Sequence, residues 1–194
     1  MRTLIVHEFM SLDGVVQAPG GPDEDRDGGF THGGWTGPYW HDDMGTAFFQ
    51  AMQSVDAFLL GRRTYEIHAG AFEPMPAGDP FGDLMNAPKK YVVSRTLAAP
   101  IWRDTTIIRD DVVEAVRSLK AQPGKDILTD GSSQLVQTLL EHDLVDELQV
   151  TLYPVSLGGG KRILPAGVRR NFQLTSATPY PTGVVGLKYA RQAS

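Results

Sequence analysis

The sequence predicts an α/β fold, a three-layer α/β/α sandwich in which helices cover both faces of a mixed β-sheet. Short apolar segments typical of buried strands alternate with segments whose apolar residues recur at helical spacing. Three of the predicted strands run directly into turns rich in glycine or hydroxyl residues, as strands of nucleotide-binding sheets do. Two alternating segments near the end of the chain predict a C-terminal β-hairpin, which makes the sheet mixed.

The composition is that of a soluble globular protein. A chain of 194 residues is long enough for one well-buried domain, so we expect a single domain over residues 1–194. The net charge of −5 argues against a nucleic-acid partner. No apolar run approaches the roughly 18 residues that span a bilayer, and the N-terminus lacks the apolar core of a signal peptide. The absence of cysteine excludes disulfides and thiolate chemistry, and we expect a cytoplasmic protein.

The first predicted strand covers residues 3–10 and is followed by the sequence Ser11–Gly14. The Asp-Gly pair there is typical of a turn, in which glycine can take positive φ. Asp13 is therefore either a turn residue or a carboxylate held at the strand end, where α/β sheets place their chemistry. Spacing alone favours the turn residue.

Residues 17–40 form a long segment rich in glycine and proline. Its aromatic residues would be an exposed apolar patch in a free loop, so we expect a loop that folds over a ligand or a partner subunit. Within it, residues 23–28 resemble the first half of a calcium-binding EF-hand loop. Gly34 stands where the bidentate glutamate would be needed, and no helices flank the loop. We therefore predict no metal site.

Residues 42–55 have the apolar spacing of an amphipathic helix, with Asp42 and Asp43 suited to its first turn. A short buried strand over residues 56–60 then runs into the turn Gly61–Thr64, which carries two arginines. Arginine forks suit phosphate oxygens, although two exposed arginines on a helix are the alternative interpretation.

Residues 68–88 read as a second connection rich in glycine and proline. Strands are expected at 90–93 and 105–109, and the first of these ends in hydroxyl residues and an arginine, Ser94–Leu97. A helix with an apolar stripe follows the second strand, and Pro123–Gly124 ends it.

The central stretch runs from Lys125 to Lys161. A short strand around Ile127 ends in Asp130-Gly131-Ser132-Ser133, and a helix follows to about His142. The free N–H groups and the dipole of such a helix face whatever lies over the turn, and an anion suits that position. An extended segment over residues 145–155 then leads to a second glycine cluster.

Three junctions, at 61–64, 94–96 and 131–133, thus follow buried strands. If these strands are parallel, as the intervening helices indicate, all three junctions share the carboxyl edge of the sheet. Together they describe a site for a ligand with several phosphates. Arg62 and Arg95 would suit the 2′-phosphate that distinguishes NADPH from NADH.

Five motifs in this order resemble the dihydrofolate reductase-like superfamily. The similarity is greatest to the branch of the C-terminal reductase domain of the bifunctional riboflavin-biosynthesis deaminase/reductase, and it covers essentially the whole chain. The motifs are SLDG (11–14), LLGRRTYE (59–66), KYVVSRTL (90–97), GSSQLVQTLL (131–140) and LVDELQVTLYPVSLGGGK (144–161).

The resemblance implies an NADPH-dependent reductase, often homodimeric, with a dihydrofolate reductase-like sheet. The loop beside the nicotinamide and substrate matches Asp13 and Gly14. The positions that match the family's cofactor-binding residues are Gly14, Gly61, Arg62, Arg63, Thr64, Ser94, Arg95, Gly131, Ser132, Ser133 and Leu135.

The sequence departs from the family pattern in two places. Relatives commonly carry an uncharged residue where this chain has Asp130, whose carboxylate would face the cofactor phosphates unless it points away. Folate reductases place an acidic residue on the first helix shortly after a tryptophan. The segment Trp40–Met44 resembles that arrangement, but its spacing is shorter.

The resulting hypothesis is an NADPH-dependent reductase of a pterin-like or ribosylaminopyrimidine substrate. Asp13 is the first candidate for the polar group beside the reacting atoms and Asp43 the second. The candidates for the substrate end are Trp40, Tyr153, Pro154, Gly158 and Gly159. The alternative is a nucleotide-binding dimer of the same fold that lacks catalysis, and Asp130 favours it.

Overall fold

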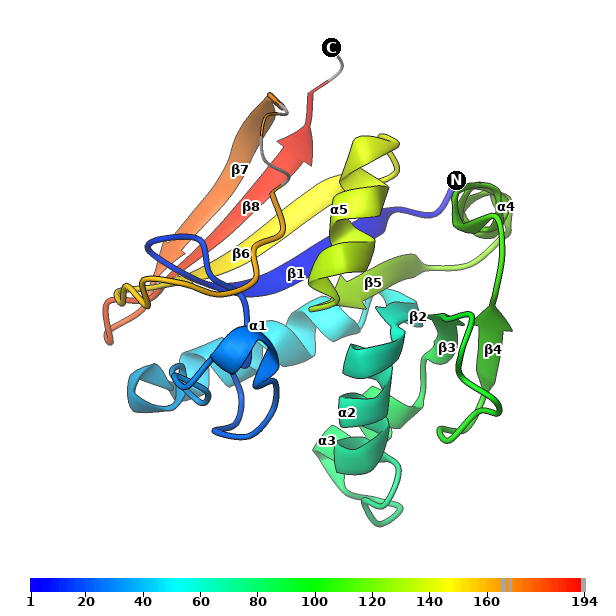
Figure 1. Cartoon of the computed structure of the whole chain (residues 1–194), viewed down its shortest axis with the longest axis horizontal. Helices are drawn as coiled ribbons and strands as arrows, with labels where there is room; N and C mark the ends of the chain where they lie inside the picture. The colour runs from blue at the N-terminus through cyan, green and yellow to red at the C-terminus, as the bar shows by residue number, and fades with distance from the viewer. Residues whose placement is uncertain (165–166, 168, 193–194) are drawn as a thin grey trace.

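The computed structural model describes residues 1–164, 167 and 169–192, and over them it has an eight-stranded mixed sheet covered by helices on both faces (Figure 1). The order of the strands is β4-β3-β2-β5-β1-β6-β8-β7. The predicted α/β class with a mixed sheet is confirmed. The expected single domain covers residues 1–194. Of these, residues 165, 166, 168, 193 and 194 lie outside the described residues.

The strands are β1 (Leu4–Ser11), β2 (Val55–Gly61), β3 (Lys89–Val93), β4 (Thr105–Ile108), β5 (Asp126–Asp130), β6 (Glu147–Tyr153), β7 (Phe172–Pro179) and β8 (Val185–Arg191). The helices are α1 (Asp42–Met52), α2 (Arg62–Phe72), α3 (Pro80–Asn86), α4 (Val112–Ala121) and α5 (Ser133–Glu141). Strands β1 to β6 pair in parallel, and the hairpin of β7 and β8 adds to β6 in antiparallel orientation. No described helix is long and apolar enough to cross a membrane.

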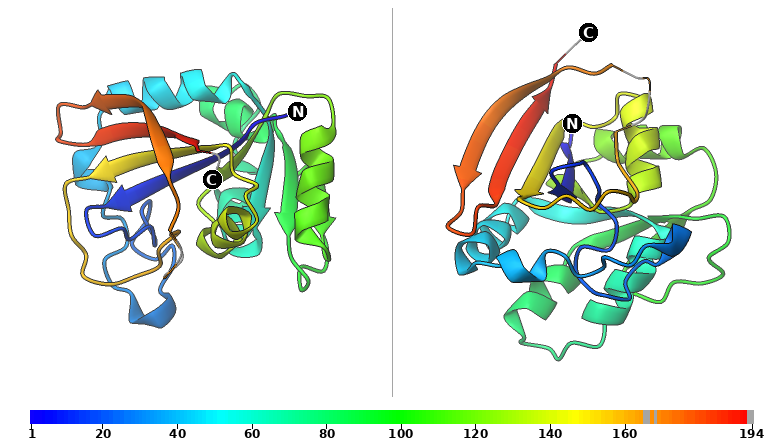
Figure 2. Two further views of the ribbon diagram at one scale, coloured as in Figure 1. Left: turned by 90° about the horizontal axis from the view of Figure 1, so that it is seen from above. Right: turned by 60° about the vertical axis from the view of Figure 1, so that its left-hand side comes forward.

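The two faces of the sheet bury separate apolar clusters. In β1, Leu4 and Val6 point to the cluster beneath α4 and α5, whereas Ile5 points to the cluster beneath α1, α2 and α3. This alternation has the period of two that a strand buried on both faces requires. The two views in Figure 2 show α5 and α1 on opposite sides of the sheet. The predicted three layers are therefore present.

The helix prediction was wrong in two places. The first helix ends at Met52 instead of residue 55, because Val55 already pairs in β2. Residues 68–88 are mostly helical instead of irregular, since α2 continues to Phe72 and α3 begins at Pro80. The side chain of Asp79 accepts hydrogen bonds from the amides of Phe81 and Gly82 and so caps α3.

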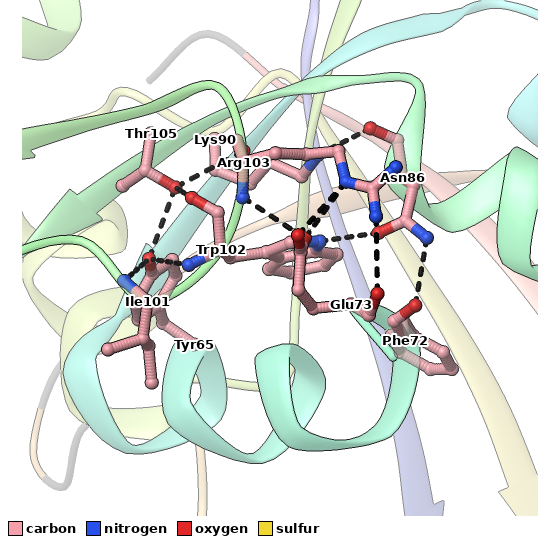
Figure 3. Close-up of polar contacts among 9 residues, drawn as sticks. All are labelled: Tyr65, Phe72, Glu73, Asn86, Lys90, Ile101, Trp102, Arg103 and Thr105. Atoms are coloured by element: carbon pink, nitrogen blue, oxygen red, sulfur yellow. Dashed lines mark hydrogen bonds and ion pairs between the residues drawn. The ribbon is translucent and has the colours of Figure 1, made fainter. Parts of the chain in front are cut away.

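A polar network fastens α2 and α3 to the segment between β3 and β4 (Figure 3). The hydroxyl of Tyr65, on α2, accepts hydrogen bonds of 2.9 Å from the amides of Ile101 and Trp102. Asn86 accepts a bond of 2.6 Å from the indole of Trp102 and donates one of 2.8 Å to the carbonyl of Phe72. These bonds fix the axis of α2, and thereby its first turn at the carboxyl edge of the sheet.

Lys90 is fully buried in the same network, where its ammonium group lies 4.6 Å from the ring centre of Trp102 and donates to the carbonyl of Asn86. Burial lowers the pKa of Lys90 to about 8. The negative charges of Asp104 and Glu73 act in the other direction and raise this pKa, but burial has the larger effect.

We expect Tyr65→Phe to lower the free energy of unfolding by about 1–3 kcal/mol, because two backbone amides lose their acceptor. Urea denaturation measures the difference. Tyr91→Phe is the matched control, since the Tyr91 hydroxyl makes no hydrogen bond to the described residues. Equal stability of the two variants would contradict the role given to the Tyr65 hydroxyl.

Glu8 is the one acidic residue of β1 and is only 2% exposed. Its Oε1 atom has no hydrogen-bond partner among the described residues. Burial, and secondarily the charge of Asp130, raises the pKa of Glu8 well above its ordinary value. A carboxyl group whose pKa is raised by folding stabilises the fold at low pH, and that contribution is lost as the pH rises above the pKa of the unfolded chain.

Glu8→Gln is therefore expected to gain stability relative to the natural protein as the pH rises from about 5, since glutamine does not ionise. Thermal unfolding of both proteins between pH 5 and 8 measures the difference. A constant difference across this range would show that Glu8 ionises at its ordinary pKa.

Candidate functional site

A cleft of about 1890 Å³ runs along the carboxyl edge of the parallel strands. Pockets for single small ligands commonly measure about 300–1,000 Å³, so this cleft has room for two ligands side by side. It extends from the ends of β3, β2 and β5 to the space between α1 and the strands β1, β6 and β8.

The three junctions predicted from the sequence lie next to one another in this cleft. Strands β3, β2 and β5 are neighbours in the sheet and run parallel, so the turns that follow them meet at one edge. The predicted cofactor-binding residues that line the cleft are Gly61, Arg62, Arg63, Thr64, Ser94, Arg95, Gly131, Ser132, Ser133 and Leu135. Gly14 does not line it and lies beside the side chain of Arg162.

The turns after β2 and β5 are in direct contact. The amide of Gly61 donates a hydrogen bond of 3.0 Å to the Ser132 hydroxyl. Gly131 has φ of 70°, and a Cβ atom there would lie 3.4 Å from the Thr64 side chain. Ser132 also has φ of 70°, which is strained for a residue with a side chain. The hydrogen bond from Gly61 holds Ser132 in this conformation.

The two helices that open onto the cleft lack the capping that the other helices have. The N-termini of α1, α3 and α4 each have a side-chain cap and an acidic residue in the first turn. Those of α2 and α5 have neither, and the first turn of α2 instead carries Arg62 and Arg63. Positive charges at a helix N-terminus are unfavourable with the helix dipole unless an anion is bound there. The chemistry of these groups therefore fits phosphate.

The arginines at this edge differ in how far they are engaged. Arg62 donates a hydrogen bond of 3.0 Å to the Thr96 hydroxyl, and its side chain is 48% exposed. The side chain of Arg95 is 83% exposed and lies 3.9 Å from Asp110. Both guanidinium groups are accessible to a ligand in the cleft.

Arg63 is already paired with the long loop. Its guanidinium contacts Asp25 and Asp27, which also accept hydrogen bonds from Lys161 at 2.6 and 2.8 Å. The hydrogen bonds from Arg63 and then Lys161 lower the pKa of Asp27 to about 2. These ion pairs hold the loop of residues 17–40 against the first turn of α2. The acidic residues that resemble an EF-hand thus bind side-chain cations of this chain.

Asp13 is held away from the cleft. Its carboxylate accepts hydrogen bonds from the Ser11 hydroxyl at 2.7 Å and from the amides of Leu157 and Gly158 at 3.1 and 2.8 Å. The bond from Ser11, followed by that from Leu157, lowers the pKa of Asp13 to about 2. It is absent from the cleft lining, so its contacts favour the turn role over the chemical one.

The remaining candidates from the sequence separate into two groups. Trp40 lines the cleft beside α1 and is 57% exposed. Asp43 is exposed and lies outside the lining, with His41 as its neighbour. Tyr153 is 1% exposed and packs edge-on against Phe9 and Trp35. The other predicted substrate residues outside the lining are Pro154, Gly158 and Gly159.

The sequence reasoning missed a polar group inside the cleft. His7 on β1 and Asp130 on β5 are joined by a hydrogen bond of 2.7 Å between Nδ1 and Oδ1. His68 on α2 places Nε2 3.8 Å from the other oxygen of Asp130. Nε2 of His7 lies 3.3 Å from the Thr151 hydroxyl on β6. The available signal was that His7 interrupts an apolar strand, but its partners are more than 60 residues away along the chain.

The burial of this group shapes its electrostatics. Burial raises the pKa of Asp130, but the hydrogen bond and charge of His7 and the charge of His68 outweigh it, and the pKa lies below its ordinary value. Burial lowers the pKa of His68, and the charge of Asp130 partly opposes this. Asp130 therefore stays ionised, and its carboxylate is directed at the two histidines.

Comparisons with known proteins agree with this fold. Residues 2–186 match the family described as the RibD C-terminal domain. The uncharacterized protein YyaP of Bacillus subtilis (strain 168) is 30% identical over 194 residues, with 97% of this chain and 94% of that protein covered.

Solved structures show the same architecture. A putative riboflavin biosynthesis protein from Shewanella sp. PV-4 matches with a TM-score of 0.70 at 20% identity, covering 98% of this chain and 99% of that one. Dihydrofolate reductase from Enterococcus faecalis, complexed with NADP(H), matches with a TM-score of 0.64 at 14% identity, covering 98% and 97%. With the family match spanning nearly all of the sequence, the chain belongs to the RibD C-terminal domain family.

Proposed function

We propose that the protein is an NADPH-dependent reductase of a small heterocyclic substrate. The observation that carries the proposal is the meeting of three turns at one edge of the sheet, where two helices present uncapped N-termini beside exposed arginines. The comparisons support the same proposal, because the structural neighbour from Enterococcus faecalis is a dihydrofolate reductase in complex with NADP(H).

The groups at this edge suit the negative charges of NADPH. The backbone amides at the starts of α2 and α5 would hold the pyrophosphate, together with Thr64, Ser132 and Ser133. Arg62 and Arg95, with Ser94, would hold the 2′-phosphate, for which a planar guanidinium is well suited. When bound, NADPH supplies a hydride to the substrate.

The far end of the cleft would take the substrate. There the aromatic residues Trp40 and Phe48 on or beside α1 face strands that carry Gln149 and Thr151. Aromatic rings on one side and hydrogen-bonding groups on the other suit a flat heterocycle with several N–H and C=O groups. A pterin-like or ribosylaminopyrimidine compound has this form. The protein's task is to hold its reacting carbon within about 3–3.5 Å of the hydride donor.

We also propose a cytoplasmic homodimer. Strand β7 is an edge of the sheet whose residues are almost all exposed, including Leu174 at 52%. An exposed edge strand with an apolar residue favours pairing with a second copy of the chain.

The competing proposal is a nucleotide-binding dimer without catalysis. Its main support in the sequence is Asp130, whose carboxylate would repel cofactor phosphates. Because Asp130 accepts a hydrogen bond from His7, its charge is already paired on the side of the histidines. Asp130 therefore repels a bound phosphate less than an unpaired carboxylate would.

Arg95→Ala and Arg62→Ala are each expected to raise the Kd for NADPH by roughly ten- to a hundredfold, since a charged hydrogen bond contributes about 1.5–3 kcal/mol. The Kd for NADH should change much less, because NADH lacks the 2′-phosphate. Quenching of tryptophan fluorescence measures both. Arg117→Ala on the exposed side of α4 is the matched control.

Two outcomes would count against the proposal. Failure of the natural protein to bind NADPH would contradict the cofactor assignment. Tight NADPH binding without loss of absorbance at 340 nm in the presence of dihydrofolate or 5-amino-6-(5-phosphoribosylamino)uracil would favour the non-catalytic dimer.

A further inference from the structure

We propose that His7, held in place by Asp130, delivers the proton that the substrate needs when it is reduced. The inference rests on the proposed reductase function and names the chemical group that completes it. Reduction of a C=N or C=O bond by hydride requires a proton for the nitrogen or oxygen atom. Neither Asp13 nor Asp43, the carboxylates first considered, lines the cleft.

The position of His7 in the sheet is the first argument. The phosphate-binding junctions follow β3, β2 and β5, whereas α1 and the strands β1, β6 and β8 form the other part of the cleft. The hydrogen bond between His7 and Asp130 crosses from β1 to β5 and therefore lies on the boundary between the two parts. If one ligand occupies each part of the cleft, the two ligands meet and react at this boundary.

The contacts of the imidazole are the second argument. Nδ1 is bound by Asp130 at 2.7 Å, which leaves Nε2 as the nitrogen that can serve a ligand. Nε2 has a longer contact of 3.3 Å with the Thr151 hydroxyl, a group that also lines the cleft. The centre of the imidazole ring lies 5.1 Å from the ring centre of Phe9 and 6.1 Å from that of Phe48. Packing against these two rings fixes the orientation of the imidazole. The side chain is still 12% exposed, toward the cleft.

The charges around the pair are the third argument. Asp130 is ionised, and a carboxylate at this distance is a charge partner for an imidazolium ion. The other titratable groups that face Asp130 are His68 on α2, Glu24 in the long loop, and Glu8 on β1. Burial lowers the pKa of His68 and raises that of Glu8, which favours the neutral form of both. Asp130 thus places a carboxylate charge 2.7 Å from Nδ1 of His7.

As the carbon of the C=N or C=O bond gains the hydride that NADPH would give up in becoming NADP⁺, the π electrons of that bond would move to the nitrogen or oxygen. This atom forms a new bond to the proton that leaves Nε2 of His7, and the imidazole becomes neutral. Water entering the cleft then returns a proton to Nε2. Asp130 keeps its charge throughout and acts as a positioning residue.

The test uses three variants of the full-length protein. His7→Gln keeps a hydrogen-bond donor without a transferable proton, His7→Phe keeps only the ring shape, and Asp130→Asn removes the charge. His142→Gln, at the exposed end of α5, is the matched control. For each we measure the Kd for NADPH and the rate of NADPH oxidation with dihydrofolate and with 5-amino-6-(5-phosphoribosylamino)uracil.

We expect both His7 variants to lose about 100-fold or more in kcat with whichever substrate the natural protein reduces, because a general acid contributes about 10²–10⁴-fold. The Kd for NADPH should change less than twofold in both. Asp130→Asn should show a smaller fall in kcat. Turnover by His7→Gln and His7→Phe at the rate of the control would overturn the assignment of His7 while leaving the reductase function in place. Failure of the natural protein itself to reduce either substrate would contradict the reductase function and this inference with it.

A second readout needs neither cofactor nor substrate. The carbon NMR signal of the Asp130 carboxyl group reports its pKa in the free protein. His7→Phe should raise this pKa, because the main group that opposes burial is removed, whereas the control should leave it unchanged. An identical pKa in the natural protein and His7→Phe would show that the two residues are not coupled and would overturn the inference. A far-UV circular dichroism spectrum of His7→Phe equal to that of the natural protein verifies that its fold is intact.

Discussion

The hydrogen bond from the Gly61 amide to the Ser132 hydroxyl is the contact on which the site depends. It joins the turn after β2 to the turn after β5, two parallel strands that are neighbours in the sheet although more than 60 residues separate them in sequence. Because each turn begins a helix, the contact sets the starts of α2 and α5 side by side. Ser132 takes a strained left-handed conformation at this contact.

Electrostatics at this edge follow from the same arrangement. Two helix dipoles point their positive ends into one cleft, without the side-chain caps and acidic first-turn residues that α1, α3 and α4 carry, and arginines add further positive charge. The long loop compensates part of that charge by pairing Asp25 and Asp27 with Arg63. Beyond the boundary marked by His7 and Asp130, aromatic and polar side chains such as Phe48 and Thr151 replace the arginines, and Lys188 of β8 also lines this part. One sheet edge thus carries two chemically distinct halves.

Sequence patterns predicted the parts of this structure that depend on local order. The strand–turn–helix junctions at Gly61 and Gly131 were identifiable because glycine follows an apolar strand, and the hairpin because two alternating segments are close in sequence. The helix α3 was missed since its glycine and proline content resembles a loop, whereas Asp79 and Pro80 form a normal helix start. Contacts between distant residues could not be predicted. From the sequence alone, Asp130 is a negative charge beside a predicted phosphate site. Only the pairing of β1 with β5 shows that His7 is its partner.

The central claim is that the turns after β3, β2 and β5 jointly bind one dinucleotide through its phosphates. A crystal structure of the complex with NADPH tests it most directly. We predict the pyrophosphate against the first turns of α2 and α5, and the 2′-phosphate within hydrogen-bonding distance of Arg62 or Arg95. A cofactor bound elsewhere on the protein, or with its phosphates directed away from these three turns, would contradict the account.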